Sequence, residues 1–127
     1  YAFADVVIVG RSFGDLHGSD AMEPAALGKP ILMGPRYGDF EQSVSALREA
    51  CGLCVVTRDE LAGELGALLR DEKVRRAMGE ASAACVEAQR GAADRYVDMI
   101  ARVAGLGAGE SASEAAPAVA ANDGEAA

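Results

Sequence analysis

The sequence has no apolar run approaching the roughly 20 residues that a membrane-spanning helix requires, and no signal-peptide pattern opens it. It also lacks a surplus of positive charge, because its formal net charge is -8 over 127 residues. Four acidic residues, and no Lys or Arg, follow Ala104. A nucleic-acid-binding surface needs clustered positive charge. The sequence therefore predicts neither a membrane span nor a nucleic-acid partner.

Potential metal ligands are also few, with three cysteines and one histidine. Cys51 and Cys54 have CxxC spacing, but there is no second CxxC pair and His17 is remote from them, so the spacing does not predict a zinc site. No cluster of carboxylates suited to Mg²⁺ stands out either. We expect no metal and no other cofactor. We also expect Cys51 and Cys54 to be a buried, inert pair in a protein of a reducing compartment.

The sequence does contain a series of short apolar runs, which are separated by segments whose apolar residues recur at helical spacing. Residues 6–9, 31–33 and 53–56 read as strands that are buried on both faces of a parallel sheet. A short helix is expected to start between Asp20 and Glu23 and to end before Gly28. Further helices are expected over 40–50, after a Thr57–Glu60 capping box, over about 72–88 and, beyond an interruption at Gly91, around Tyr96–Val103. This order predicts an α/β fold with a doubly wound parallel sheet and additional C-terminal helices.

The chain is expected to form one domain over residues 1–104, followed by a tail over 105–127. The tail consists mainly of Ala, Gly, Ser and Glu and has almost nothing to bury, which is typical of disorder. Three strands are few for a doubly wound domain, and the opening stretch YAFADVVIVG enters a strand without an initial Met. We therefore expect a piece of a longer protein that has further strands before Tyr1.

A glycine-rich loop, Gly10 to Ser19, leaves the first predicted strand at the edge of the sheet where open α/β proteins bind ligands. It leads into the short helix that begins near Asp20. The free N–H groups of that helix start favour a phosphate or a carboxylate, with Gly18, Ser19 and Asp20 nearest to it. Asp20 complicates this prediction, since its carboxylate either repels an anion or accepts bonds from the same N–H groups as an N-cap.

Glu23 lies about one helical turn further on, and its residue type supports two interpretations. Its carboxylate can accept two hydrogen bonds from a vicinal diol, such as that of a ribose. Alternatively, it completes a capping box with Asp20 and has a purely structural role. Pro24 is tolerated only near a helix start, so it confines the first turn to this place in either case.

The stretch MEPAALGKPILMGP, residues 22–35, resembles the nucleotide-sugar half of GT-B glycosyltransferases and, more closely, the 3-deoxy-D-manno-octulosonic acid (Kdo) transferases. That family reads approximately as an apolar strand, GGS, a loop, GGHNPLEPAAxGKPVLxGP and then NF. The counterparts here are Gly10-Arg11-Ser12, Gly18-Ser19-Asp20-Ala21-Met22-Glu23-Pro24-Ala25-Ala26, Gly28-Lys29-Pro30, Gly34-Pro35 and Asp39-Phe40. The stretch EAQRGAADRYVDMI, residues 87–100, is similar to the family's ANxGAxxRxxxxI ending. The resemblance covers roughly residues 1–103 and implies a Rossmann-like sheet in the C-terminal half of a GT-B fold.

The resemblance implies a glycosyltransferase that moves Kdo from CMP-Kdo to a lipid A precursor in lipopolysaccharide synthesis, without a metal, at the cytoplasmic face of the inner membrane. The residues that it implies for binding the donor nucleotide sugar are Gly10, Arg11, Ser12, Gly18, Ser19, Asp20, Glu23, Gly34 and Pro35. In the family, the catalytic base, the surface for the lipid acceptor and the membrane anchor belong to the N-terminal half. No catalytic residue is therefore assigned here, and the chain alone is expected to be soluble and inactive.

The sequence departs from the family pattern at three places. Arg11 replaces the second Gly of GGS, Ser19-Asp20 replaces His-Asn, and Asp39 replaces the Asn before Phe40. Arg11 either offers a cation to a phosphate or is a solvated loop residue. The substitutions leave open a different nucleotide sugar as the donor. They also leave open a stand-alone, non-catalytic α/β module that binds a nucleotide or a protein.

Three further polar residues are not assigned to the site. Asp15 and His17 lie in the glycine-rich loop and are interpreted as ordinary loop residues. Lys29 lies between the short helix and the second strand, and we expect it to face solvent rather than to bind a phosphate.

Overall fold

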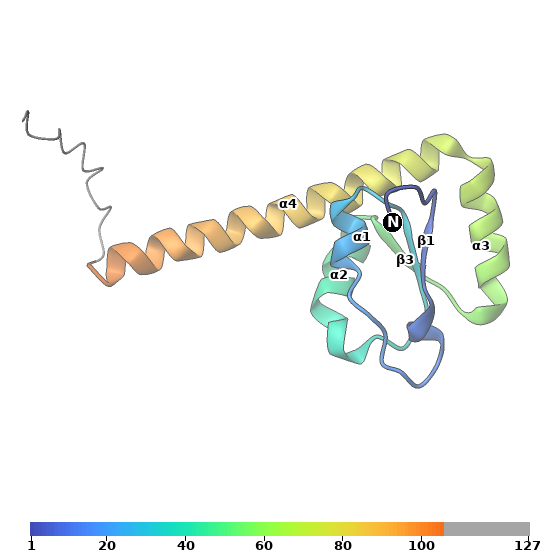
Figure 1. Cartoon of the computed structure of the whole chain (residues 1–127), viewed down its shortest axis with the longest axis horizontal. Helices are drawn as coiled ribbons and strands as arrows, with labels where there is room; N and C mark the ends of the chain where they lie inside the picture. Colours follow the sequence, from blue (N-terminus) through green and yellow to red (C-terminus); the bar gives the residue numbers. More distant parts are fainter. Residues whose placement is uncertain (106–127) are drawn as a thin grey trace, which may run out of the picture. The chain divides into compact units, whose positions relative to one another are not determined.

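The computed structural model describes residues 1–105 and shows strands alternating with helices (Figure 1). The strands are β1 (Val7–Val9), β2 (Ile31–Met33) and β3 (Leu53–Val55), and the helices are α1 (Met22–Ala26), α2 (Glu41–Glu49), α3 (Arg58–Arg70) and α4 (Glu72–Val103). Short 3-10 helices follow β1, as η1 (Gly10–Phe13), and precede α2, as η2 (Gly38–Phe40). Apart from Gly105, the expected tail over 105–127 lies outside the described residues.

The strands form a parallel sheet in the order β1-β2-β3, with Val7 opposite Ile31 and Ile31 opposite Leu53. Parallel neighbours require a crossover between them, which α1 and α2 provide. Figure 1 shows α1 and α2 on one side of the strands and α3 on the other. The predicted α/β fold, a Rossmann-like parallel sheet with helices on both faces, is confirmed.

Two apolar clusters fill the two faces of the sheet, because neighbouring side chains of a strand point in opposite directions. The first contains Val9, Ala21, Ala25, Ile31, Met33, Val44, Leu47, Leu53 and Val86. The second contains Leu32, Val56 and Leu68, with Leu61 and Leu65 of α3 packed against it. All three residues of β2 are fully buried, as predicted for a central strand of a parallel sheet.

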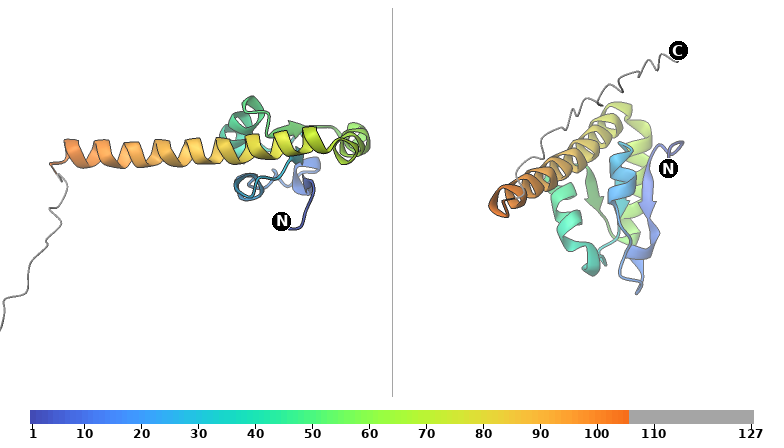
Figure 2. Two further views of the ribbon diagram at one scale, coloured as in Figure 1. Left: turned by 90° about the horizontal axis from the view of Figure 1, so that it is seen from above. Right: turned by 60° about the vertical axis from the view of Figure 1, so that its left-hand side comes forward.

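Helix α4 runs without a break from Glu72 to Val103, as both views in Figure 2 show. The predicted interruption at Gly91 is wrong. A glycine inside a helix costs only about 1 kcal/mol relative to alanine, and the alanines that follow Gly91 favour the helix. Residues 1–94 form one compact unit, and the end of α4, from Arg95 to Val103, does not belong to it.

The first part of α4 packs closely against the segments that lead into β2 and β3. A Cβ atom on Gly79 would lie 2.2 Å from the carbonyl oxygen of Gly28, and one on Gly52 would lie 2.6 Å from the Ser82 hydroxyl oxygen. The buried Ser82 hydroxyl donates a hydrogen bond to the Gly52 carbonyl at 2.7 Å. Larger side chains would not fit these contacts. We refer to Gly28, Gly52, Gly79 and Ser82 as the α4 seam; it lies at the amino ends of the strands.

The predicted capping box at the start of α3 is confirmed. The Thr57 hydroxyl accepts a hydrogen bond from the Glu60 N–H at 3.4 Å, and the Glu60 carboxylate accepts one from the Thr57 N–H at 2.9 Å. The bond from the Thr57 backbone, followed by that from its hydroxyl, lowers the pKa of the Glu60 carboxyl below its ordinary value. The cap fixes where α3 begins after β3.

The prediction that Cys51 and Cys54 form a buried pair is wrong for Cys51, which is exposed. Cys54 is half-buried, and burial, followed by the charge of Glu64, raises the pKa of its thiol. Both cysteines are free thiols. Cys51 is exposed because it ends a helix rather than entering the next strand.

Helix α2 ends in a Schellman motif that has a cysteine where glycine is usual. The Gly52 N–H donates to the Leu47 carbonyl at 2.8 Å, and the Cys51 N–H donates to the Arg48 carbonyl at 2.9 Å. The motif requires a left-handed residue at its C′ position, and Cys51 has a φ of 62°. An L side chain at this φ is strained.

Replacing Cys51 with glycine is expected to stabilise the protein by roughly 0.5–1 kcal/mol. A side chain in the left-handed region costs about 1–2 kcal/mol, and the greater freedom of glycine in the unfolded chain cancels part of the gain, roughly 0.4–1 kcal/mol. The measurement is the free energy of unfolding in urea. Cys51→Ala keeps the Cβ atom and should leave stability nearly unchanged, so an equal gain in both variants would contradict this explanation.

Candidate functional site

The carboxyl ends of the strands meet at one edge of the sheet, where the predicted site residues Gly10–Ser12 and Gly34–Pro35 follow β1 and β2. Ser12 ties these two ends together. Its buried hydroxyl donates to the Val9 carbonyl and accepts from the Gly34 N–H at 2.6 Å. A Cβ atom on Gly34 would lie 2.5 Å from the Ser12 carbonyl oxygen. The Ser12 hydroxyl and the Gly34 N–H are therefore engaged within the protein and shape this edge.

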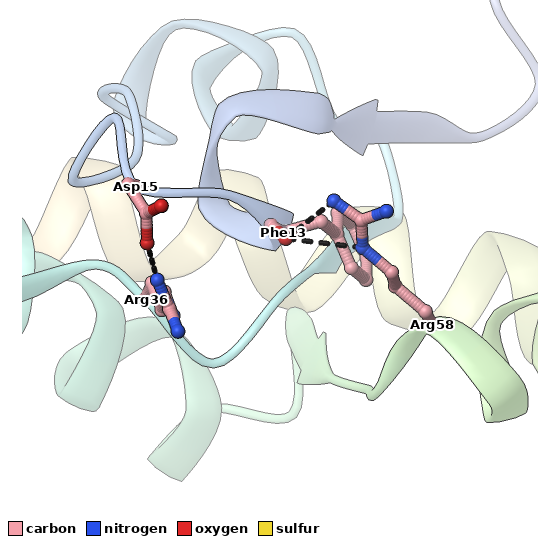
Figure 3. Close-up of polar contacts among 4 residues, drawn as sticks. All are labelled: Phe13, Asp15, Arg36 and Arg58. Atoms are coloured by element: carbon pink, nitrogen blue, oxygen red, sulfur yellow. Dashed lines mark hydrogen bonds and ion pairs between the residues drawn. The ribbon is translucent and has the colours of Figure 1, made fainter.

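Two arginines that sequence reasoning missed connect the loops at the same edge (Figure 3). Arg36 forms an ion pair with Asp15, and its backbone N–H donates to the Ser12 carbonyl at 3.0 Å. Arg58, the first residue of α3, donates from Nε at 3.1 Å and from Nη2 at 2.8 Å to the Phe13 carbonyl. Both arginines follow soon after the carboxyl end of a strand, which was the signal available in the sequence.

The loop between η1 and α1 folds back onto the segment after β2. His17 and Gly18 both have positive φ angles, 56° and 85°. A Cβ atom on Gly18 would lie 3.2 Å from both the Arg36 carbonyl oxygen and the Tyr37 Cα. Only glycine combines this backbone conformation with so close an approach at low cost. The structure thus brings Gly18 and its neighbour Ser19 to the same edge as Gly10–Ser12.

Helix α1 begins at Met22, within the predicted range, but the predicted capping box of Asp20 and Glu23 is wrong. The N-cap residue is Ala21, one position later than expected, and it makes no side-chain cap. The Asp20 carboxylate instead accepts a hydrogen bond from the Met22 N–H at 2.9 Å. Because α1 has only five residues and Asp20 uses one of its first N–H groups, its N-terminus attracts an anion less strongly than the sequence predicts.

Glu23 is exposed and lines a hollow between α1 and α4. The hollow has a volume of about 630 Å³. Its lining comes from Met22, Glu23 and Ala26 of α1 and the following Leu27, and from Val86, Gln89, Arg90 and Ala93 of α4. Sequence reasoning did not associate these α4 residues with Glu23. The available signal was the stretch 87–100, which the family resemblance includes but to which it assigns no role.

The remaining predicted site residues lie at or near the carboxyl edge without polar partners that would define a role. Arg11 is exposed in η1, which is compatible with both interpretations of its side chain. Gly10 and Pro35 are exposed, and Ser19 is half-buried.

Lys29 does not simply face solvent, because it is half-buried and donates to the Ala2 carbonyl at 2.9 Å. It precedes β2 and therefore lies at the opposite edge of the sheet.

The described residues at the carboxyl edge provide hydrogen-bonding groups and charges but no cluster of metal ligands. Among residues 1–105, no group of three His, Cys, Asp or Glu side chains is placed to hold a metal ion. Within the same part of the chain, no helix is both long enough and apolar enough to cross a bilayer.

The fold and this edge define the class of protein: a parallel α/β domain whose loops gather at the carboxyl ends of its strands, where open sheets bind ligands. Within this class, the chain is similar to 3-deoxy-D-manno-octulosonic acid transferases. It is 34% identical to that of Bordetella pertussis over 101 residues and 29% identical to that of Haemophilus influenzae over 102 residues. The resemblance expected from residues 22–35 is thereby confirmed.

Each of these matches covers 79% of the chain but 24% of the relative, so the chain spans about a quarter of the length of the curated relatives that it matches. No family model matches the chain, and no solved structure matches it significantly.

Proposed function

We propose that this chain is the donor-binding part of a GT-B glycosyltransferase that moves Kdo from CMP-Kdo to a lipid A precursor in lipopolysaccharide synthesis. The observation that carries the proposal is the position of Glu23 in a chain similar to Kdo transferases. Its carboxylate is exposed at the start of α1, takes no part in a helix cap and lines a hollow. A carboxylate so placed is suited to accept two hydrogen bonds from the diol of a ribose.

In this proposal the donor phosphate lies against the loop that leaves β1. Gly10 and Ser19 let the phosphate approach the backbone, while the buried Gly18 folds the loop onto the segment after β2. Arg11 supplies a charge-assisted hydrogen bond. Ser12 and Gly34 act indirectly, since their mutual hydrogen bond fixes the loop to the end of β2. Asp20 accepts a hydrogen bond from the Met22 N–H at the start of α1 and does not contact the phosphate. Pro35 follows Gly34 and ends the segment that borders the donor at this edge.

The remaining parts of the reaction are assigned to the rest of the enzyme. The catalytic base, the lipid-acceptor surface and the membrane contact lie outside this chain, at the cytoplasmic face of the inner membrane. The reaction needs no metal in this proposal, because the charges on the donor are met by backbone N–H groups and Arg11. The chain alone therefore binds nucleotide without transferring sugar.

The proposal is tested by titrating the 127-residue protein with CMP, and with UMP and AMP for comparison, while following its amide NMR signals. We expect CMP to bind with a millimolar dissociation constant, with shifts centred on the residues around Glu23. The same protein, incubated with CMP-Kdo and a lipid A precursor, should transfer no Kdo. Absence of CMP binding at millimolar concentration would refute donor binding by this chain, and a clear preference for UMP or AMP would refute CMP-Kdo as the donor.

A further inference from the structure

We propose that Arg58 is a positioning residue for η1, the turn that follows β1. From the start of α3 it holds the end of η1 through the Phe13 carbonyl, and it does not itself contact a ligand. The effect of Arg58 on the position of η1 is independent of the proposed function, whereas its effect on ligand affinity rests on that function.

The contact between Arg58 and η1 joins parts of the chain that are 45 residues apart (Figure 3). Nε and Nη2 of the Arg58 guanidinium donate to the same oxygen, the Phe13 carbonyl, at 3.1 Å and 2.8 Å. The guanidinium is planar and rigid, so two donors on one oxygen fix its direction more closely than one donor does. Because Phe13 is the last residue of η1, the contact fixes where the turn ends.

The position of Arg58 in α3 is one that the helix dipole does not favour for a cation. Arg58 is the first residue of the helix, where free N–H groups favour negative charge. Asp59 and Glu60, in the same turn, follow this rule. The charge of Arg58 therefore does not stabilise α3, and its contribution is the contact with Phe13.

Both sides of this contact are themselves held in place. Arg58 directly follows Thr57, whose capping box with Glu60 fixes the start of α3. The half-buried Phe13 side chain packs against the second apolar cluster of the sheet. The guanidinium thus connects a fixed helix start with a residue that is anchored in the core, and only one long side chain has to be ordered.

The ion pair of Arg36 and Asp15, at the same edge, is less suited to this role. Its two side chains are 60% and 90% exposed. An exposed ion pair contributes little, because two flexible side chains must be ordered and salt screens their attraction. We therefore assign the positioning of η1 to Arg58 rather than to the side chain of Arg36.

Two backbone N–H groups after β2 report on the position of η1. The Gly34 N–H donates to the Ser12 hydroxyl at 2.6 Å, and the Arg36 N–H donates to the Ser12 carbonyl at 3.0 Å. Ser12 precedes Phe13, so both hydrogen bonds weaken when η1 moves. The Val56 N–H serves as the reference, because it donates within the sheet, to the Met33 carbonyl at 2.8 Å.

The test measures amide hydrogen exchange of these N–H groups in the 127-residue protein without ligand. Arg58→Ala should speed exchange of Gly34 and Arg36 about threefold to tenfold, the effect of one ordinary hydrogen bond, and leave the Val56 rate unchanged. The melting temperature should not fall, because α3 loses no favourable charge. Arg58→Lys, which keeps the charge without the planar fork, should give intermediate rates.

Arg70→Ala is the matched control, since Arg70 is also an exposed arginine of α3 but lies at its other end. It should leave the rates of all three N–H groups unchanged. Unchanged rates at Gly34 and Arg36 in Arg58→Ala would overturn the inference. So would an equal increase at Val56, because the whole domain would then have lost stability.

A titration with CMP separates this inference from the proposed function. Arg58→Ala should bind CMP about threefold to tenfold more weakly than the wild type, and Arg70→Ala should bind it equally well. Equal CMP affinity of Arg58→Ala and the wild type would overturn the effect on ligand binding. If exchange changes as expected but the wild type binds no CMP, Arg58 still positions η1 and the proposed function alone fails.

Discussion

Replacing Gly79 with alanine is expected to lower the free energy of unfolding by roughly 1–3 kcal/mol. The new Cβ atom would lie 2.2 Å from the Gly28 carbonyl oxygen, a backbone atom that cannot move without shifting the segment before β2. The gain in helix propensity, about 1 kcal/mol for glycine to alanine, offsets only part of the clash. At roughly 4–8 °C per kcal/mol for a domain of this size, the melting temperature should fall by about 5–20 °C.

The matched control is the same substitution in another helix. Gly63 in α3 is exposed, and a Cβ atom there would meet no other atom within 4 Å. Gly63→Ala should therefore stabilise the protein by about 0.5–1 kcal/mol. The two variants are compared by thermal and urea unfolding. Gly79→Ala and Gly63→Ala shifting stability in the same direction would show that the seam contact is not as tight as described.

The proposed ribose contact predicts that Glu23→Gln reduces the CMP affinity of this chain tenfold to a hundredfold. A hydrogen bond to a charged group contributes about 1.5–3 kcal/mol, which corresponds to this range. The structure sharpens the test, because Glu23 takes no part in a helix cap. Its replacement should therefore change stability by no more than about 0.5 kcal/mol.

Glu41→Gln is the control for this experiment. Glu41 is also an exposed acidic residue in the first turn of a helix, but it belongs to α2 and does not line the hollow. Its replacement should leave CMP binding unchanged. Equal CMP affinity of the wild type and Glu23→Gln, measured beside unchanged melting temperatures, would rule out the ribose contact.

Local sequence patterns predicted the elements whose determinants are local. The apolar run of β2 gave a buried strand, and the Thr57–Glu60 capping box formed because both of its hydrogen bonds span three residues. The Asp20–Glu23 box failed by a single position, because Ala21 became the N-cap. Gly91 was given too much weight as a helix breaker, since the cost of one glycine is small compared with the favourable residues around it.

The candidate site could be predicted only where it follows the strand ends. The loop that begins at Gly10 was predicted in this way, because parallel strands place their carboxyl ends at one edge, whereas Ser12 and Gly34 were assigned through the family resemblance. The hollow beside Glu23 is lined by residues of both α1 and α4, which lie far apart in the sequence. The two hydrogen bonds of the buried Ser12 hydroxyl could not be predicted either, because the sequence does not indicate which groups a loop serine contacts.

The α4 seam has a consequence for how this protein can evolve. Its tight contacts lie at the amino ends of the strands, whereas Arg11 and Asp20, which depart from the family pattern, are exposed near the opposite ends. Substitutions at such exposed positions usually change stability by no more than about 0.5 kcal/mol. Mutation and selection can therefore change the exposed residues at the carboxyl edge of the sheet, where we propose that the ligand binds, while the contacts at the amino edge preserve the ability to fold.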